Sequence, residues 1–134
     1  MAKKLNYTYA LGRRRSASAR VRLFRGKGAN TVNEKPIEEY FPGILDKMVW
    51  SKPFTVTQTS EKYYISARVV GGGKEGQVDA VAFATARAIS GVKPDEYRSL
   101  LKKAGLLRRD SRIRERRKIG MGGQARRKKQ SPKR

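Results

Sequence analysis

Apolar and polar residues alternate along one stretch near the start of the chain. In residues 16–24, alanine and aliphatic side chains occupy every second position, and serine and arginine occupy the positions between them. This period of two predicts a β-strand with one face toward the core and one that carries positive charge. Residues 7–12 predict another strand.

Glycine, asparagine and proline divide the next part of the chain into short elements. Residues 25–30 predict a turn, because their glycines and asparagine tolerate positive φ, and residues 31–33 are expected to be the return strand of a hairpin. Pro36 then opens a short helix. Residues 37–41 and 44–50 predict two brief helical segments that Pro42 and Gly43 separate. Helical spacing turns five apolar side chains inward: Phe41, Ile44, Leu45, Met48 and Val49.

A second hairpin is predicted in the middle of the chain. Residues 54–59 and 62–70 are rich in β-branched and aromatic side chains, and only Ser60 and Glu61 separate them. A Gly-rich loop, residues 71–76, follows.

Two further helices are predicted after this loop. Residues 77–90 contain five alanines among apolar residues, and Gly91 is a natural C-terminal stop. One closely packing face is expected to contain Ala80, Val81, Ala84 and Ala88. Pro94, with two acids after it in the first turn, opens the second helix, which is expected to run through Leu101 and to end at Ala104 and Gly105.

Composition limits how much of the chain can fold. The chain has 134 residues, of which 37% are hydrophobic, below the roughly 45 to 50% of ordinary globular domains. We therefore expect one globular domain, residues 1–106, and an extended basic tail, residues 107–134. The tail holds too little apolar surface to offset the entropy of ordering it, so it is expected to be disordered when free.

Charge indicates the partner, and missing residue types exclude most chemistry. The 33 Lys and Arg residues outnumber the 11 Asp and Glu residues, giving a net charge of +22, so the expected partner is a polyanion.

The chain has no Cys and no His, which excludes disulfides, thiolate or imidazole metal sites and His-based acid-base catalysis. We predict no catalytic residue, no metal and no cofactor. No signal peptide or apolar span is apparent, so a soluble, cytoplasmic protein without a membrane partner is expected.

An arginine cluster on the first two strands is the first candidate RNA contact. Guanidinium groups suit phosphates because their planar fork donates two parallel hydrogen bonds, and serine hydroxyls add shorter contacts. The alternative is a charged strand edge that only discourages aggregation. We favour RNA contact, because acids are rare in this part of the chain. The predicted contacts are Arg13, Arg14, Arg15, Ser16, Arg20 and Arg22.

The Gly-rich loop is the second candidate. Its backbone is able to approach RNA phosphates closely at the start of the following helix, and an equally weighted alternative is a simple strand-to-helix connection. A nucleotide-binding loop is much less favoured, because Glu75 follows Lys74 where a Walker loop needs Ser or Thr. The predicted RNA contacts are Gly72, Gly73, Lys74 and Gln77.

The basic tail is the third candidate. The alternative is a tail that only solubilises the protein. Fifteen cations in the last 35 residues, with glycines between the clusters, instead suit a segment that threads between RNA helices. The predicted RNA contacts are Arg108, Arg109, Arg112, Arg116, Arg117, Lys118, Arg126, Arg127, Lys128 and Lys129. The six tyrosines are able to stack on unpaired bases, but most lie in strand patterns that favour a half-buried structural role.

These motifs together resemble the universal family of the ninth protein of the small ribosomal subunit, in its bacterial form. Four stretches carry the resemblance: Gly12 to Ser16 with Ala19, Arg20 and Val21; Glu39, Tyr40 and Phe41; Gly71 to Gly73 with Gly76, Gln77 and residues 84–88; and Ala104, Gly105 and Leu106 with Arg109, Asp110 and the terminal Lys133 and Arg134. The resemblance covers essentially the whole chain and displaces the nucleotide-binding alternative.

The resemblance implies a fold, a set of partners and a location in the cell. The fold is an α/β (α+β) domain with a four-stranded sheet packed by helices and a left-handed β-α-β crossover, which general handedness rules would not predict. The implied partners are ribosomal RNA of the subunit head, neighbouring head proteins and the peptidyl-site transfer RNA, in the cytoplasmic ribosome. Lys133 and Arg134 match the family's final residues, which approach the transfer RNA.

The tail departs from the family pattern in three respects. Gly122 and Gly123 stand where the family usually has cations, the usual aromatic before the final serine is missing, and Pro132 precedes the last two residues. Pro132 fixes its own φ and favours an extended Ser131, so the path of the last two residues is expected to differ from that of the family.

Composition leaves two other classes of protein as alternatives: a nucleic-acid packaging protein and a nucleotide-dependent enzyme.

Overall fold

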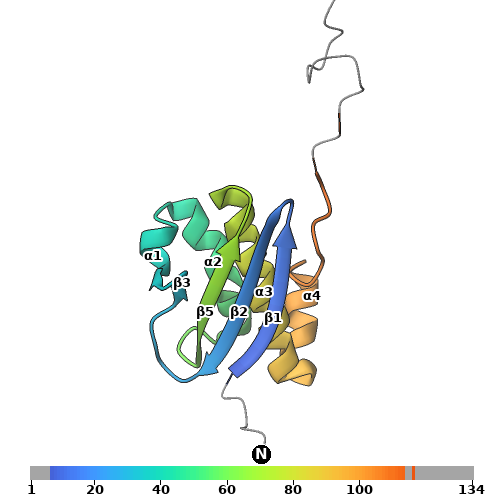
Figure 1. The fold of residues 1–134 in the computed structure, drawn as a ribbon. Helices are drawn as coiled ribbons and strands as arrows, with labels where there is room; N and C mark the ends of the chain where they lie inside the picture. Colours follow the sequence, from blue (N-terminus) through green and yellow to red (C-terminus); the bar gives the residue numbers. More distant parts are fainter. Residues whose placement is uncertain (1–6, 114–115, 117–134) are drawn as a thin grey trace, which may run out of the picture.

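The structure is a computed structural model that describes residues 7–113 and residue 116. A mixed sheet forms one layer and helices form the other (Figure 1). The strands are β1 (Tyr7–Arg14), β2 (Ala17–Arg25), β3 (Thr31–Val32), β4 (Lys35–Pro36) and β5 (Tyr63–Val70), in the order β1-β2-β5-β3-β4. The helices are α1 (Ile37–Tyr40), α2 (Ile44–Thr57), α3 (Lys74–Val92), the π-helical turn η1 (Pro94–Arg98) and α4 (Ser99–Lys103).

Helices cover only one face of the three long strands. In Figure 1, α2 and α3 lie behind β1, β2 and β5, and no helix of the described residues crosses the face turned to the viewer. Alternate residues of each strand are buried against the helices, as the period of two predicted. On β2 these are Ala17, Ala19, Val21 and Leu23. We call the uncovered side the open face of the sheet.

Small residues let α3 approach β1 very closely. A Cβ atom on Gly12 would lie 2.7 Å from the backbone nitrogen of Ala84, 2.9 Å from its Cβ, and even nearer to the carbonyl oxygen of Ala80. The predicted alanine face of this helix is confirmed, since Ala80, Val81, Ala84 and Ala88 are all buried. Strand and helix therefore pack backbone to backbone along this line.

The predicted strand at residues 54–59 is wrong, because α2 continues through Thr57. Trp50, Pro53, Phe54 and Thr57 are buried at helical spacing, so core packing overrides the β-branched composition. The threonines are accommodated by hydrogen bonds to carbonyls four residues earlier, as when Thr57 Oγ1 donates to Pro53 O at 2.8 Å. The second predicted hairpin therefore does not exist.

The same packing reverses the expected orientation of the first half of α2. Phe41 is buried as predicted and Val49 is partly buried, but Ile44, Leu45 and Met48 are 81%, 76% and 64% exposed. The buried stripe runs through Trp50, Pro53 and Phe54, which places these three apolar side chains on the opposite side of the helix.

The sheet has five strands rather than four, and β3 is not the return strand of a hairpin. It pairs parallel with β5 and antiparallel with the two-residue β4, and it does not pair with β2. Asparagine side chains extend this pairing: Asn33 accepts from Val69 N at 2.9 Å and Asn30 accepts from Ile65 N at 3.0 Å. Since α1 and α2 connect the parallel neighbours β3 and β5, a β-α-β connection is present. Its handedness stays a prediction.

Helix boundaries differ from the predicted ones because only some glycines take left-handed backbone angles. Gly91 does not, and α3 runs through it to Val92. Gly105 has a φ of 75°, and its amide donates to Lys102 O at 3.1 Å while Leu106 N donates to Leu101 O at 3.0 Å. This pair of bonds ends α4 at the predicted place. None of the helices in the described part of the chain is long and apolar enough to cross a membrane.

Candidate nucleic-acid interface

Two of the predicted arginines lie on the open face of the sheet, in the middle strand. Arg22 is in register with Tyr9 on β1 and Ser66 on β5. Arg20 is in register with Leu11 and with Arg68, an exposed cation that is not among the predicted contacts. The alternation along residues 62–70 was the signal for Arg68, because it places this residue on the same side as Tyr64 and Ser66.

A row of aromatic rings crosses the open face at the end where β1 begins. Phe24 lies between Tyr7 and Tyr64, with ring centroids 5.6 and 5.2 Å away, and the pair with Tyr64 is stacked. The backbone at Gly28 presses on Tyr64, because a Cβ there would lie 2.8 Å from the ring. The guanidinium of Arg22 lies 5.0 Å from the centroid of Tyr7. These rings therefore have a half-buried structural role, as predicted for most of the tyrosines.

The tip of the β1–β2 hairpin and the Gly-rich loop meet at the start of α3. Gly71 has a φ of 78°, and a Cβ there would lie 2.6 Å from Ser16 O, so the two turns touch through backbone. The lining of a hollow at this junction includes Arg15, Ser16, Gly72, Gly73 and Lys74, together with the acidic Glu75. All six are exposed, and the first amides of the 19-residue helix α3 begin here. The arrangement suits a phosphate group.

Gln77, a predicted RNA contact, uses both ends of its side chain within the fold. Its Nε2 donates to Gly71 O at 3.0 Å, and its Oε1 accepts from the Tyr40 hydroxyl at 2.9 Å. The residue is buried, so it holds the Gly-rich loop in place. Lys74 remains at the surface, with its ammonium 5.1 Å from the centroid of the Tyr40 ring.

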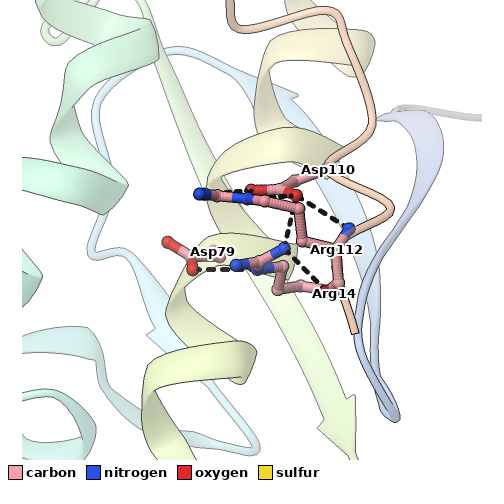
Figure 2. Close-up of polar contacts among 4 residues, drawn as sticks. All are labelled: Arg14, Asp79, Asp110 and Arg112. Carbon is pink, nitrogen blue, oxygen red and sulfur yellow. Dashed lines mark hydrogen bonds and ion pairs between the residues drawn. The ribbon is translucent and has the colours of Figure 1, made fainter. Parts of the chain in front are cut away.

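Arg14 differs from its neighbours Arg13 and Arg15, which are exposed. It is only 8% exposed, and its guanidinium lies between Asp79 of α3, at 3.5 Å, and Asp110, at 2.6 Å (Figure 2). It also donates to the carbonyl of Arg112 at 3.2 Å. The Arg112 guanidinium in turn donates to both carboxylate oxygens of Asp110. Arg14 therefore fastens the segment around Asp110 to the domain, and this geometry gives no support to its predicted RNA contact.

The two carboxyl groups of this cluster have opposite pKa shifts. Hydrogen bonds from the side chain and backbone of Arg112 hold the pKa of Asp110 well below its usual value. Burial raises the pKa of Asp79, and the attraction of Arg14 at its longer distance only partly offsets that effect. The interactions of ionised Asp110 thus stabilise the fold above its usual pKa and are lost only as pH falls through its lowered pKa. Asp79 acts in the opposite sense, since its contribution is lost as pH rises through its raised pKa.

We predict that a carboxyl-carbon NMR titration will separate the two groups. Asp110 should titrate below the ordinary value of about 3.9 and Asp79 above it. In the variant Arg112→Gln, the midpoint of Asp110 should move back toward that value while Asp79 stays raised. An Asp110 midpoint at or above the ordinary value in the wild-type chain would contradict the hydrogen bonds in Figure 2.

The predicted tail contacts divide into described and undescribed positions. Arg108, Arg109 and Arg116 are exposed, whereas Arg112 is exposed but bound to Asp110. The other predicted contacts lie outside the described residues: Arg117, Lys118, Arg126, Arg127, Lys128, Lys129, Lys133 and Arg134.

The described residues carry many exposed cations, which are able to bind an anion. Within residues 7–113 and 116, no group of three or more metal-ligating side chains comes together. Exposed cations lie on the open face, at the hairpin tip and at the start of the tail, as well as elsewhere on the surface, for example on α2. Exposed cations of this kind suit the phosphate groups of a nucleic acid.

Comparisons with known proteins agree over most of the chain. A family model described as ribosomal protein S9/S16 matches residues 12–134. The chain is 47% identical to the small ribosomal subunit protein uS9 of Maridesulfovibrio salexigens over 118 residues, which cover 88% of this chain and 90% of the relative. It is 48% identical to the protein of the same name in Desulfotalea psychrophila over 115 residues, covering 86% and 88% of the two chains.

Proposed function

The chain belongs to the ribosomal protein S9/S16 family, and from this premise we propose that its domain binds ribosomal RNA of the small-subunit head while its tail reaches the peptidyl-site transfer RNA. It is a structural protein of the small ribosomal subunit, of bacterial type, and not an enzyme. Its place of action is then the ribosome in the cytoplasm, with other head proteins as neighbours.

The observation that carries the RNA-binding proposal is the set of exposed cations that the domain leaves free. Among the described residues, Arg20 and Arg22 have no carboxylate partner, and neither do Arg15 and Lys74 at the hairpin tip. A stable fold does not need these charges, whereas counterion release makes each of them favourable on an RNA surface.

We assign two roles to the predicted contacts. Arg14 and Gln77 hold the fold together, so we assign them to positioning their neighbours. The groups available to contact RNA are Arg13, Arg15, Ser16, Arg20, Arg22, the backbone of Gly72 and Gly73, Lys74, Arg108, Arg109 and Arg116. Arg112 is available only in part, because Asp110 engages it.

A salt wash of ribosomal subunits tests the proposed function against general nucleic-acid packaging. The chain should co-sediment with small subunits through a high-salt wash, because a specific site combines many contacts, whereas nonspecific phosphate binding falls steeply with salt. The same wash on chain bound to random duplex DNA is the control and should remove it. Equal release from both particles would favour the packaging alternative.

The proposed contact with the peptidyl-site transfer RNA is made by Lys133 and Arg134, which lie outside the described residues. Deleting both should weaken transfer RNA binding in the peptidyl site of isolated small subunits by about five- to tenfold, since two charge contacts of modest strength are lost. Subunit assembly should be unchanged. The matched control is Lys47→Gln with Lys52→Gln, which removes the same charge from the exposed side of α2. Unchanged transfer RNA affinity after the deletion would rule out the contact.

A further inference from the structure

We propose that the open face of the sheet binds a stretch of unpaired RNA nucleotides, with Tyr9 stacked on a base and Arg20, Arg22 and Arg68 on the phosphates. This inference rests on the proposed function and deepens it. It names the part of the domain that touches RNA and the form of RNA that fits there.

Tyr9 is the one tyrosine of this face whose ring is left available. Tyr9 is 53% exposed, whereas Tyr7 and Tyr64 are half-buried in the aromatic row with Phe24. Among the described residues, Tyr9 forms no aromatic pair and has no cation over its ring. An exposed ring on a rigid strand is a ready surface for a base to stack on.

The cations stand where the backbone of such a nucleotide would run. A hollow on the open face is lined by Tyr9, Arg20, Arg22, Ser66, Arg68 and Glu34, among others. Arg22 lies beside Tyr9 in the same row of the sheet, and Arg20 and Arg68 occupy the next row. A base on Tyr9 would thus have three guanidinium groups within the same hollow.

Charge selects a polyanion as the occupant of this hollow. Glu34 is the only acid in its lining, and it lies 3.9 Å from Arg68 with both side chains largely exposed, 89% and 70%. Such an exposed pair is weak, so a phosphate is able to replace the carboxylate. An RNA duplex would supply phosphates but would keep its base faces stacked inside, out of reach of Tyr9. Unpaired nucleotides supply both groups.

Photocrosslinking to the full-length chain tests this inference directly. The probes are an oligouridine of about 10 nucleotides that carries 5-iodouridine, and a duplex of the same length with the same modified base. Mass spectrometry should find an adduct on Tyr9 that forms several times more efficiently with the single strand. Adducts confined to other residues, or equal yields from single strand and duplex, would overturn the inference.

Variants on the open face give a second readout, measured by single-strand affinity at raised salt, where the contribution of the tail is reduced. Tyr9→Ala should weaken binding about tenfold, and Tyr9→Phe, which keeps the ring, should bind within about twofold of wild type. Met48→Ala is the matched control, because it also shortens a well-exposed side chain but on α2. Equal affinities for Tyr9→Ala and Met48→Ala would count against stacking on Tyr9.

The arginines are tested by the yield of the Tyr9 adduct. Arg20→Gln with Arg68→Gln should lower this yield about tenfold, while the control pair Lys47→Gln with Lys52→Gln should leave it unchanged. An equal yield from both pairs would show that the phosphates do not lie on the open face. If the chain survives the salt wash of small subunits but fails these tests, only this inference is wrong. If it also fails the wash, the proposed function is wrong.

Discussion

Replacing Gly12 with alanine is expected to destabilise the domain by about 3 kcal/mol, the largest effect we predict for a single substitution. The added methyl group would meet the backbone nitrogen of Ala84 at 2.7 Å and would press on the carbonyl of Ala80. Both are backbone atoms of α3, so no side chain is able to rotate out of the way. The helix as a whole would have to move away from β1, opening the packing on both sides.

Urea unfolding of the full chain measures this loss of stability. In thermal unfolding, the melting temperature is expected to fall by at least about 10 °C. Gly91→Ala is the matched control, because Gly91 lies within α3, lacks a left-handed φ and would meet only a methyl group of Thr8 at 3.8 Å. It should be neutral or stabilise by up to about 1 kcal/mol, since alanine favours a helix. If the two variants have equal stability, the close approach of β1 and α3 is wrong.

Ending the chain at Arg116 is expected to lower affinity for ribosomal RNA on the order of a thousandfold at physiological salt. The deletion removes eight cations: Arg117, Lys118, Arg126, Arg127, Lys128, Lys129, Lys133 and Arg134. Every cation that neutralises a phosphate releases counterions, so the dependence of log affinity on log salt should also fall, by roughly 6 if most of the eight engage RNA. Salt titration of RNA binding measures both quantities.

Two full-length variants distinguish the contribution of the tail's charge to RNA affinity from that of its backbone conformation. Replacing the eight cations by glutamine should reproduce the loss of affinity, because the phosphate contacts disappear while the length is kept. Gly122→Ser with Gly123→Ser changes the backbone and keeps every charge, so its affinity should remain close to that of wild type. A glutamine variant that binds like wild type would show that the domain alone holds the RNA.

Arg14 shows what motif recognition misses in a cluster of like residues. Three consecutive arginines suggest three equal RNA contacts, yet the middle one is buried between Asp79 and Asp110. The period of two along β1 contained part of the answer, because Ala10, Gly12 and Arg14 lie on the side that faces the helices. The two acidic partners lie far along the chain, so no local pattern links them to Arg14.

Helix α2 shows why composition alone fails for short segments. Residues 54–59 contain three threonines and a valine, which favour a strand when nothing else is known. In the fold, Phe54 and Thr57 lie on the buried stripe of α2, and that burial outweighs the small intrinsic preference. The same stripe decides that Ile44, Leu45 and Met48 face outward.

The sequence by itself determined the features that depend on neighbouring residues or on total charge. These are the strands β1, β2 and β5, the alanine face of α3, the end of α4 at Gly105 and the expectation of a polyanionic partner. The tertiary structure alone decided the parallel pairing of β3 with β5, the course of α2 and the attachment of Asp110 to Arg14. Each of these depends on contacts between distant residues, and the free energy of such contacts exceeds the local preferences from which a pattern is read. The available ring of Tyr9 belongs to the same group, because the packing of Tyr7, Phe24 and Tyr64 is what sets it apart.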